Sequence, residues 1–489
     1  MSNLFYCIKD YIFDVNNMNK EEICFMSAID MFDAIRRQEL TSIEITETII
    51  ERIEKINPIT NAYCTTTFDL AREMAREADD KVKKGEKLGL LNGIPTSIKD
   101  LNPVKGIRTT YGSKIYENHI PDHDDIAVRR LKKEGCVILG KTNTPEFGFK
   151  GVTDNLIFGY SRNPWNLDLT TGGSSGGAAS AVVSGLGPLA QGSDGGGSIR
   201  HPSSFCGAFG LKPSFGRVPR YPKLFPLGLD LAVIGPIVRN VKDAALMLDA
   251  MKGPFEGDKA TLPKDGFRYI DKISEVPEGL KIGYSLDLGY AKAVDTEVEK
   301  NILNSVELFE NFGWNIERVK MKLRKAQLSF TTIWTSTLGY NLKSYLKEWE
   351  DKMDPDLVKL IKAGLGYDGM SLPRALAVRA QVYETIYKVF KNYDILITPS
   401  TAIPAFKLGI MFPSKINGIN VSPTAWMPFS FPFNMTGHPA ASIPSGWSSN
   451  RLPIGMQIIG KRFDELTVLQ VSKAFEELAP WQDKRPNFS

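Results

Sequence analysis

Residues 170–187 read TTGGSSGGAASAVVSGLG, and residues 192–202 read GSDGGGSIRHP. Two Gly-Ser clusters therefore lie close together in the chain, joined by a run of small and apolar residues. Glycines at this density allow backbone N–H groups to approach another group closely. A flexible linker would not interleave Gly and Ser with Ala-Val-Val and Pro-Leu-Ala, which favour burial. The pattern predicts glycine-rich loops around a tightly packed helix in the protein interior.

Two helices are predicted near the start of the chain. Residues 41–56 place isoleucines at helical spacing, and Thr41 with Glu44 forms a capping box in front of them. Residues 67–84 predict a second helix with an apolar face that ends before a glycine.

A short apolar run, LNGIPTSIKD at residues 91–100, predicts a buried strand with Lys99 near its exit. The order of helix and then apolar strand recurs at 125–134 and 136–139, at 296–312 and 314–319, and at 380–392 and 394–398. Such alternation is typical of an α/β protein with a largely covered sheet. The last predicted elements are a strand at 452–460 and a helix from about residue 464. The Pro- and Gly-bearing stretch 253–280 fits either a domain boundary or a surface loop within one domain.

Charge and hydropathy exclude several classes of partner. The 489 residues include 60 Lys and Arg against 56 Asp and Glu, a net charge of +4. This small excess gives no electrostatic reason to expect a nucleic acid or an anionic membrane as partner. No apolar run approaches the roughly 20 residues that a membrane span needs. The first residues also lack the pattern of a secretory signal.

The cysteines predict no disulfide framework and no zinc site. Their number is odd, they lie far apart and none forms a CxxC pair; they are Cys7, Cys24, Cys64, Cys136 and Cys206. Ordinary thiols in a reducing cytoplasm fit this pattern. Residues 1–25 are interpreted as an N-terminal extension, since Met18 would also serve as a start.

With GLKPSFGRVP at 210–219, the two opening segments resemble the amidase-signature family. Further segments resemble the family in its own order: GIPTSIKD (93–100), GKTNTPEFG (140–148), NPWN (163–166), TPS (398–400) and PFNMTGHPAASIP (432–444). The resemblance covers roughly residues 40–480. It implies one α/β/α layered domain, residues 26–489, around a large mixed, mostly parallel sheet.

The resemblance implies a Ser–cis-Ser–Lys triad. The family's lysine falls on Lys99, its bridging serine on Ser174 and its nucleophile on Ser198, at separations of 75 and 24 residues (174 − 99 and 198 − 174) that match the family. The peptide bond between Gly173 and Ser174 is expected to be cis. The implied reaction is hydrolysis of a carboxylic amide to acid and amine through an acyl-enzyme on Ser198, without a metal or an organic cofactor.

These residue types suit that chemistry. A serine hydroxyl needs a base, and a lysine is a base only when its pKa is lowered far below about 10.4. Lys99 ends an apolar segment, so its burial is expected, and Ser174 can relay the proton. The N–H groups of Gly195, Gly196, Gly197 and the nucleophile form the expected oxyanion hole.

Residues beside the triad are expected to support it. Asp194 and Arg200 fit an internal salt bridge better than substrate contacts, and Ser175 fits a hydrogen-bonding role next to the relay serine. Thr171 stands where the family commonly has proline, which changes the rigidity of the turn and not the chemistry.

Three other motifs offer alternative sites. GCVILGKT at 135–142 matches a phosphate-binding loop, but an apolar strand occupies the positions where that loop must be open. GGSSG at 172–176 matches the nucleophile elbow of α/β-hydrolases, which would need a downstream histidine such as His438. Cys206 and His201 could form a Cys–His pair, although SSFCG favours a packed core.

A second functional hypothesis comes from the same family. It includes the glutamine-hydrolysing amidase subunit of a tRNA-dependent amidotransferase complex. GKTNTPEFG and the WQDKRP ending are more similar to the stand-alone amidases. The expected partner is therefore a small-molecule amide, with a homodimer left open.

Substrate selectivity is expected to lie in residues 320–375. Phe330, Trp334 and Tyr340 are the apolar candidates there, and Trp426 and Phe429 are further ones; ordinary core packing explains each at least as well.

Overall fold

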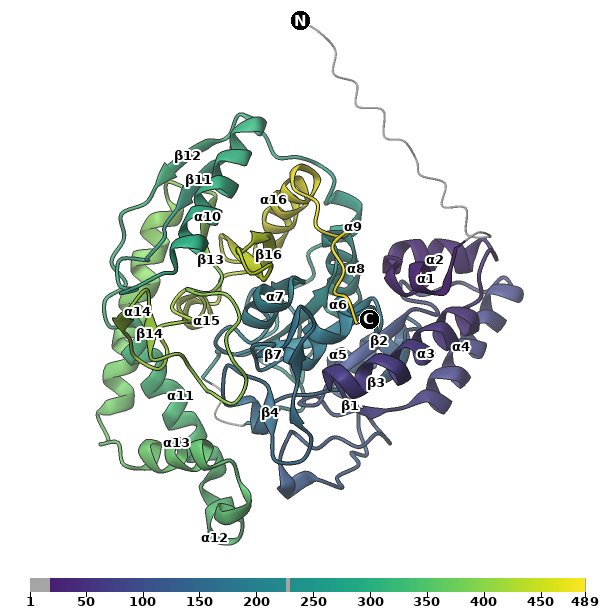
Figure 1. The fold of residues 1–489 in the computed structure, drawn as a ribbon, viewed down its shortest axis with the longest axis horizontal. Coiled ribbons are helices and arrows are strands. Elements are labelled where there is room, and N and C mark those ends of the chain that lie inside the picture. Colours follow the sequence, from purple (N-terminus) through teal and green to yellow (C-terminus); the bar gives the residue numbers. More distant parts are fainter. Residues whose placement is uncertain (1–17, 226–228, 489) are drawn as a thin grey trace, which may run out of the picture.

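The computed structural model describes residues 18–225 and 229–488, so most of the expected N-terminal extension lies outside the described residues. An 11-stranded sheet crosses this part of the chain (Figure 1). In order across the sheet, the strands are β1 (Tyr63–Thr66), β3 (Val137–Thr142), β2 (Pro95–Lys99), β8 (Leu189–Asp194), β10 (Val233–Val238), β9 (Phe209–Lys212), β16 (Ala440–Trp447), β17 (Pro453–Gly460), β13 (Ile395–Pro399), β11 (Lys281–Tyr284) and β12 (Asn315–Arg318).

The sheet is mixed. Strand β2 lies parallel to β3 and β8, and β11 lies parallel to β12 and β13. The strands from β8 to β13 through the centre of the sheet pair antiparallel, as does β1 with β3. The expected α/β fold around a large mixed sheet is confirmed, with its parallel pairs concentrated in these two blocks.

Helices cover the sheet in layers. Helices α6 (Gly176–Val183) and α7 (Arg200–Cys206) contact each other and the central strands, and α8 (Val241–Met251) and α16 (Glu465–Leu478) form a second contacting pair. The other helices are α1 (Lys20–Phe25), α2 (Ala28–Arg36), α3 (Ser42–Thr60), α4 (Phe68–Lys83), α5 (Ile126–Lys133), α9 (Tyr269–Lys272), α10 (Thr296–Leu308), α11 (Ala326–Leu342), α12 (Leu346–Trp349), α13 (Pro355–Leu365), α14 (Ser371–Phe390) and α15 (Phe431–Thr436). The part of the chain that the structure describes also holds three two-stranded sheets: β4 (Asp154–Asn155) with β5 (Gly159–Tyr160), β6 (Arg162–Asn163) with β7 (Asn166–Thr170), and β14 (Lys415–Ile416) with β15 (Ile419–Asn420).

Local sequence signals explain the elements that position the site. Helix α3 begins behind Thr41, whose side chain accepts from the N–H of Glu44 in the predicted capping box. Helix α6 is buried along its whole length because small residues let it pack closely; a Cβ on Gly177 would lie 2.4 Å from the backbone nitrogen of Asn143. Strand β2 ends at Lys99, as predicted.

The stretch 253–280 does not separate two cores, because Tyr269 and Ile273 belong to the main hydrophobic cluster, which also includes Ile23 and Trp481. A second cluster joins α11 and α13 to the loop that holds Phe147 and Phe149. Figure 1 shows these helices, with α12 and α14, on the side of the molecule away from the N-terminal helices. Across residues 18–225 and 229–488, no helix combines the length and the apolar character that crossing a membrane demands.

Candidate active site

Lys99 projects from the end of β2 into a cluster of hydroxyl groups. Its Nζ atom lies 2.7 Å from Ser174 Oγ, 2.8 Å from Ser175 Oγ and 3.1 Å from Ser193 Oγ. The side chain has no exposed surface, and no ion pair among the described residues includes it. Burial holds the pKa of Lys99 well below its ordinary value of 10.5, although the charge of Asp194 acts in the opposite direction.

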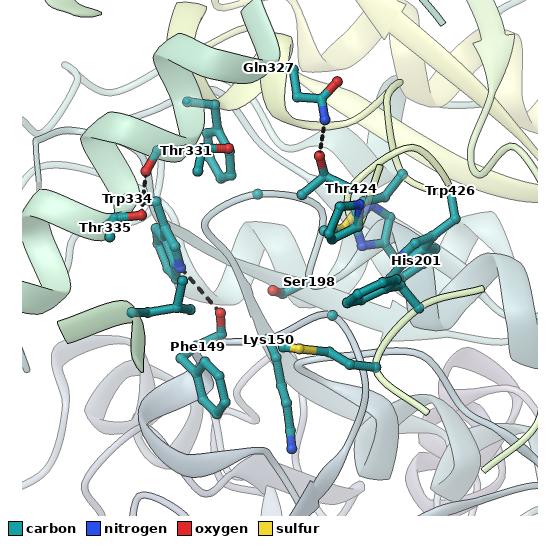
Figure 2. Close-up of a pocket in the computed structure, with 18 of the residues that line it drawn as sticks. Phe149, Lys150, Ser198, His201, Gln327, Thr331, Trp334, Thr335, Thr424 and Trp426 are labelled. Carbon is teal, nitrogen blue, oxygen red and sulfur yellow. Dashed lines mark hydrogen bonds between the residues drawn. The ribbon is translucent and has the colours of Figure 1, made fainter. Parts of the chain in front are cut away.

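The two glycine-rich loops meet at this lysine. Ser174 follows a cis peptide bond after Gly173, as expected. The N–H of Ser175 donates to the carbonyl of Ser198 at 3.1 Å, which ties the loop before α6 to the loop before α7. Ser198 is half-buried and lines a cavity of about 390 Å³ (Figure 2). No hydrogen bond joins the hydroxyls of Ser174 and Ser198 among the described residues; such contacts often tighten only when substrate is bound.

The backbone amides of the second loop are not equivalent. The N–H of Gly197 donates to Asp194 Oδ1 at 2.8 Å, so this donor is already engaged. Among the described residues, no hydrogen bond engages the N–H groups of Gly195, Gly196 or Ser198. Of the three glycines expected to supply an oxyanion hole, Gly197 is therefore not free in this structure, and the other two are.

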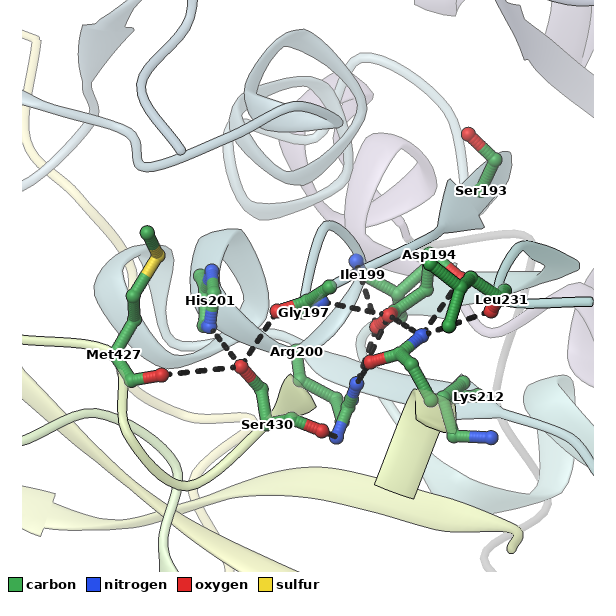
Figure 3. A network of polar contacts seen from close by, with 12 residues as sticks. Ser193, Asp194, Gly197, Ile199, Arg200, His201, Lys212, Leu231, Met427 and Ser430 are labelled. Atoms are coloured by element: carbon green, nitrogen blue, oxygen red, sulfur yellow. Dashed lines mark hydrogen bonds and ion pairs between the residues drawn. The ribbon is translucent and has the colours of Figure 1, made fainter. Parts of the chain in front are cut away.

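A buried network holds this loop from below (Figure 3). Arg200 donates to both carboxylate oxygens of Asp194, at 2.9 Å each, and neither side chain is exposed. The same guanidinium donates to Asn434 and Gln457, which come from α15 and β17. Burial alone would raise the pKa of Asp194, but the charge and hydrogen bonds of Arg200 hold it well below its usual range. The predicted internal salt bridge is present.

The cavity beside Ser198 has walls from the loop at residues 148–151 and from two further segments. Helix α11 supplies Phe330, Trp334 and other residues, in agreement with the expectation for residues 320–375. The chain from Met411 to Met427 supplies the opposite wall, including Trp426.

Two of the expected wall residues lie elsewhere. Tyr340 is 57% exposed and does not line the cavity, because it lies on the solvent face of α11. Phe429 is fully buried in the main core and does not line it either.

The phosphate-loop and Cys–His motifs do not form the sites that they would need. Lys141 lies inside β3 and donates to the Asn102 carbonyl and Thr109, so it is not presented to a phosphate. The Sγ atom of Cys206 contacts the Thr171 carbonyl at 3.6 Å, and burial raises its pKa.

Neither candidate histidine is paired as its motif would require. His201 pairs with Ser430 rather than with a thiol, at 2.7 Å from Nε2 to Oγ. His438 pairs with Thr436 at 2.8 Å and stacks on Phe390, so neither of these contacts involves the glycine-rich loop at 172–176.

The sequence analysis did not single out several residues of this site. Ser193 lies in β8, and its Oγ atom accepts a hydrogen bond from the amine of Lys99 because side chains alternate between the two faces of the strand. Its position in GSDGGG was the one available hint. Ser430, Asn434 and Gln457 lie more than 200 residues beyond the loop that they support, and only the fold brings them to it.

A serine hydroxyl at a glycine-rich loop, open to a cavity and backed by a buried amine, is the arrangement of a serine hydrolase. Comparison with known proteins gives the family. The family model described as Amidase matches residues 44–469. The chain is 35% identical to an acylamidase of Rhodococcus erythropolis over 96% of this chain and 98% of that protein. It is 36% identical to a glutamyl-tRNA(Gln) amidotransferase subunit of Carboxydothermus hydrogenoformans, over 95% and 99%.

The structure is also similar to that of a bacterial aryl acylamidase described as belonging to the amidase signature enzymes. The TM-score is 0.88 at 31% sequence identity, over 94% of this chain and 97% of the other. The chain belongs to the amidase family, and its activity is the hydrolysis of amide bonds.

Proposed function

We propose that Ser198 is the nucleophile of this amidase, that Lys99 is its base and that Ser174 carries the proton between them. The observation that carries the proposal is the lysine amine: it is fully buried, has no carboxylate partner among the described residues and lies 2.7 Å from Ser174 Oγ. An ammonium group in that position would be a buried charge without a counter-ion, which is costly. The neutral amine is therefore the favoured form, and it is a base.

The hydrogen bonds around Lys99 orient the lone pair of its neutral amine. Ser175 donates its single hydroxyl hydrogen to the Ser193 carbonyl at 3.2 Å, so its oxygen accepts from Lys99. A neutral amine has two hydrogens and one lone pair. The two hydrogens go to Ser175 Oγ and to Ser193 Oγ at 3.1 Å, so the lone pair faces the shortest contact, Ser174. Ser175 thus supports the relay without carrying the proton.

The reaction then has four steps, which are attack by Ser198, departure of the amine, attack by water and release of the acid. Ser198 Oγ attacks the amide carbon while its proton passes to Ser174, whose own proton passes to Lys99. The N–H groups of Gly195, Gly196 and Ser198 face the developing oxyanion, with Gly197 held on Asp194. The amine leaves with a proton returned through Ser174. Water attacks the acyl-enzyme by the same relay and releases the acid.

Single substitutions test these roles in an amide panel with detection of free amine. We expect Ser198→Ala and Ser174→Ala to lose about 10⁴-fold or more in kcat, and Ser175→Ala to lose markedly less. A serine-directed covalent probe should label Ser198. Full activity of Ser198→Ala would end the proposal, and labelling of Ser174 would favour the elbow motif instead.

The relative from Carboxydothermus hydrogenoformans supports a second candidate, a glutamine-hydrolysing subunit of a larger assembly. Glutaminase activity of the purified chain, together with its mass in solution, separates the two. An active chain that works alone on other amides supports the stand-alone amidase.

The remaining expectations stay proposals. We propose residues 26–489 as the amidase domain, a small-molecule amide as the partner, no nucleic acid partner and a cytoplasmic location. Cys24, Cys64, Cys136 and Cys206 are free thiols, which is compatible with a reducing compartment. Light scattering would test the homodimer.

A further inference from the structure

The charged side chain that lines the cavity is already paired. Lys150 is the lining residue with a cationic amine, and Figure 2 shows its side chain running along the wall with the nitrogen directed away from Ser198. That nitrogen is 2.8 Å from Asp154 and 2.8 Å from Asp354. No aspartate, glutamate or arginine lines the cavity among the described residues. A charged substrate group would therefore find no partner here.

Most polar groups of the walls are also paired. The Trp334 indole N–H donates to the Phe149 carbonyl at 3.1 Å, and Thr335 donates to the carbonyl of Thr331 at 2.6 Å. Gln327 donates to Thr424 across the rim (Figure 2). These bonds turn hydrogen-bonding groups toward each other, so the space inside faces aromatic rings, methionines and methyl groups.

The apolar surface reaches the reacting centre. A Cβ on Gly196 would lie 2.6 Å from Phe330, and one on Gly195 would lie 3.1 Å from Trp334. The two rings stack with centroids 6.0 Å apart and planes 14° apart. A substrate carbonyl at the amides of Gly195 and Gly196 must therefore place its neighbouring group against these rings.

We infer that the substrate is an uncharged amide whose larger substituent is aromatic or a medium-length alkyl group. The inference rests on the proposed function, since it takes Ser198 as the reacting centre. Burying apolar surface favours each added methylene, whereas an unpaired charge in the same space is strongly disfavoured. Free glutamine, with its ammonium and carboxylate groups, is a poor fit.

Two series of amides test this inference and show which side of the amide enters the cavity. One series is the primary amides of linear acids from acetic to octanoic, and the other is the acetamides of linear amines. We expect kcat/KM to rise about threefold to fourfold per methylene in one series until the cavity is full. In the series that rises, replacing the terminal methyl of one member by a carboxylate should lower kcat/KM by at least about 100-fold. Equal rates for the methyl and carboxylate members of that pair, or faster hydrolysis of glutamine, would overturn the inference.

Variants on α11 connect the preference to the cavity. Thr331→Phe should remove the gain in kcat/KM from long chains, and Thr331→Lys should shift the preference toward the carboxylate member of the pair by about tenfold. Tyr340→Phe is the matched control, since Tyr340 is on the same helix outside the cavity. Unchanged selectivity in both Thr331 variants would refute the assignment. Absence of any amide hydrolysis by the wild-type protein in both series would instead refute the proposed function.

A different observation concerns the loop itself. Ser430 precedes α15, yet its side chain makes no cap for that helix. Its Oγ atom donates to the Gly196 carbonyl at 2.6 Å and pairs with His201 Nε2 at 2.7 Å (Figure 3). A serine hydroxyl has one hydrogen, and the carbonyls of Gly196 at 2.6 Å and Met427 at 3.4 Å can only accept it, so the shorter contact to Gly196 takes it. His201 then donates to Ser430 in the tautomer that carries its hydrogen on Nε2.

One peptide group is therefore held at both ends. The carbonyl of Gly196 accepts from Ser430, and the N–H of Gly197, in the same planar unit, donates to Asp194. Glycine linkages are otherwise free to rotate. Holding this plane limits the directions that the neighbouring N–H groups of Gly196 and Ser198 can take.

We propose that Ser430, oriented by His201, is a positioning residue for the oxyanion-binding amides. Removal of a donor itself typically costs about 10²–10³ in rate, so disorder of its orientation should cost less. Ser430→Ala should lower kcat about tenfold, with KM changed less than twofold. Affinity for a trifluoromethyl ketone, which forms an oxyanion on the enzyme, should fall by the same factor, while affinity for the matching alcohol should not.

Ser430→Thr, which keeps the hydroxyl, should recover most of the activity, and Ser430→Cys replaces Ser430→Ala if the latter does not fold. Thr436→Val is the matched control, because it removes a buried hydroxyl from the same helix without a contact to the loop. A parallel loss of ketone and alcohol affinity, or a lowered Tm with unchanged kcat, would show that Ser430 has only a structural role.

Discussion

Lys99 Nζ lies 2.7 Å from Ser174 Oγ in a part of the protein where the lysine side chain has no exposed surface. Lys141 is equally buried, but it pairs with Asp100 at 3.2 Å. Two buried lysines thus have opposite environments, one with a carboxylate partner and one with hydroxyl groups alone. The second environment favours a neutral amine, and the properties of the enzyme should follow from it.

The activity should depend on the protonation of Lys99. Because burial lowers its pKa, the amine is neutral above that pKa, and kcat/KM should fall as the pH drops through it. Lys99→Met should lose this limb together with most of the activity near neutral pH. Lys99→Arg, which stays charged, should be inactive at every pH tested.

Lys212 is the necessary control for this pH profile. It is another buried lysine, and burial lowers its pKa to about 7, with Arg200 acting in the same direction. If Lys212→Met removes the limb and Lys99→Met keeps it, the base has been assigned to the wrong lysine. The measurement is kcat/KM on one amide from pH 5 to 10.

The buried neutral amine of Lys99 should also make the free energy of unfolding decrease as the pH falls. Between its lowered native pKa and its unfolded pKa near 10.5, the unfolded chain binds a proton that the native protein does not, so stability rises with pH. Between pH 7 and 9, the free energy of unfolding of the wild type should therefore rise more steeply than that of Lys99→Met, by up to about 1.4 kcal/mol per pH unit. Chemical denaturation at several pH values measures both slopes, and equal slopes would mean that the native lysine is charged.

The Asp194–Arg200 pair should be essential to the native loop. Arg200→Gln leaves a fully buried carboxylate without its cation, which typically costs about 3–5 kcal/mol. The double variant Asp194→Asn with Arg200→Gln should recover part of this loss, because it removes the uncompensated charge. Denaturation midpoints at pH 7 test the order of the three variants. A double variant less stable than Arg200→Gln would contradict this account.

His438 should be dispensable for the chemistry. It is neutral at pH 7, since burial lowers its pKa to about 3, and it contacts Thr436 and Phe390. His438→Gln should keep kcat/KM within about threefold of the wild type. A large loss in this variant, combined with an active Lys99→Ala, would instead support the elbow motif at residues 172–176.

Local sequence predicted the elements because their signals involve neighbouring residues. The capping box of Thr41 and Glu44, the small residues of α6 and the apolar run that ends at Lys99 each act within a few positions. The glycine-rich segments, together with their resemblance to a family, indicated the candidate triad and the salt bridge of Asp194 with Arg200.

The amino-acid sequence by itself determined the class of fold, the elements and the candidate residues of the site. The tertiary structure decided which donors are free, since Gly197 is engaged by Asp194 and Gly196 is held by Ser430 from 234 residues away. It also decided that Trp334 faces the cavity while Tyr340, on the same helix, faces water. The physical reason is that burial and hydrogen-bond partners are set by packing between distant segments, and spacing along the chain carries no record of that packing.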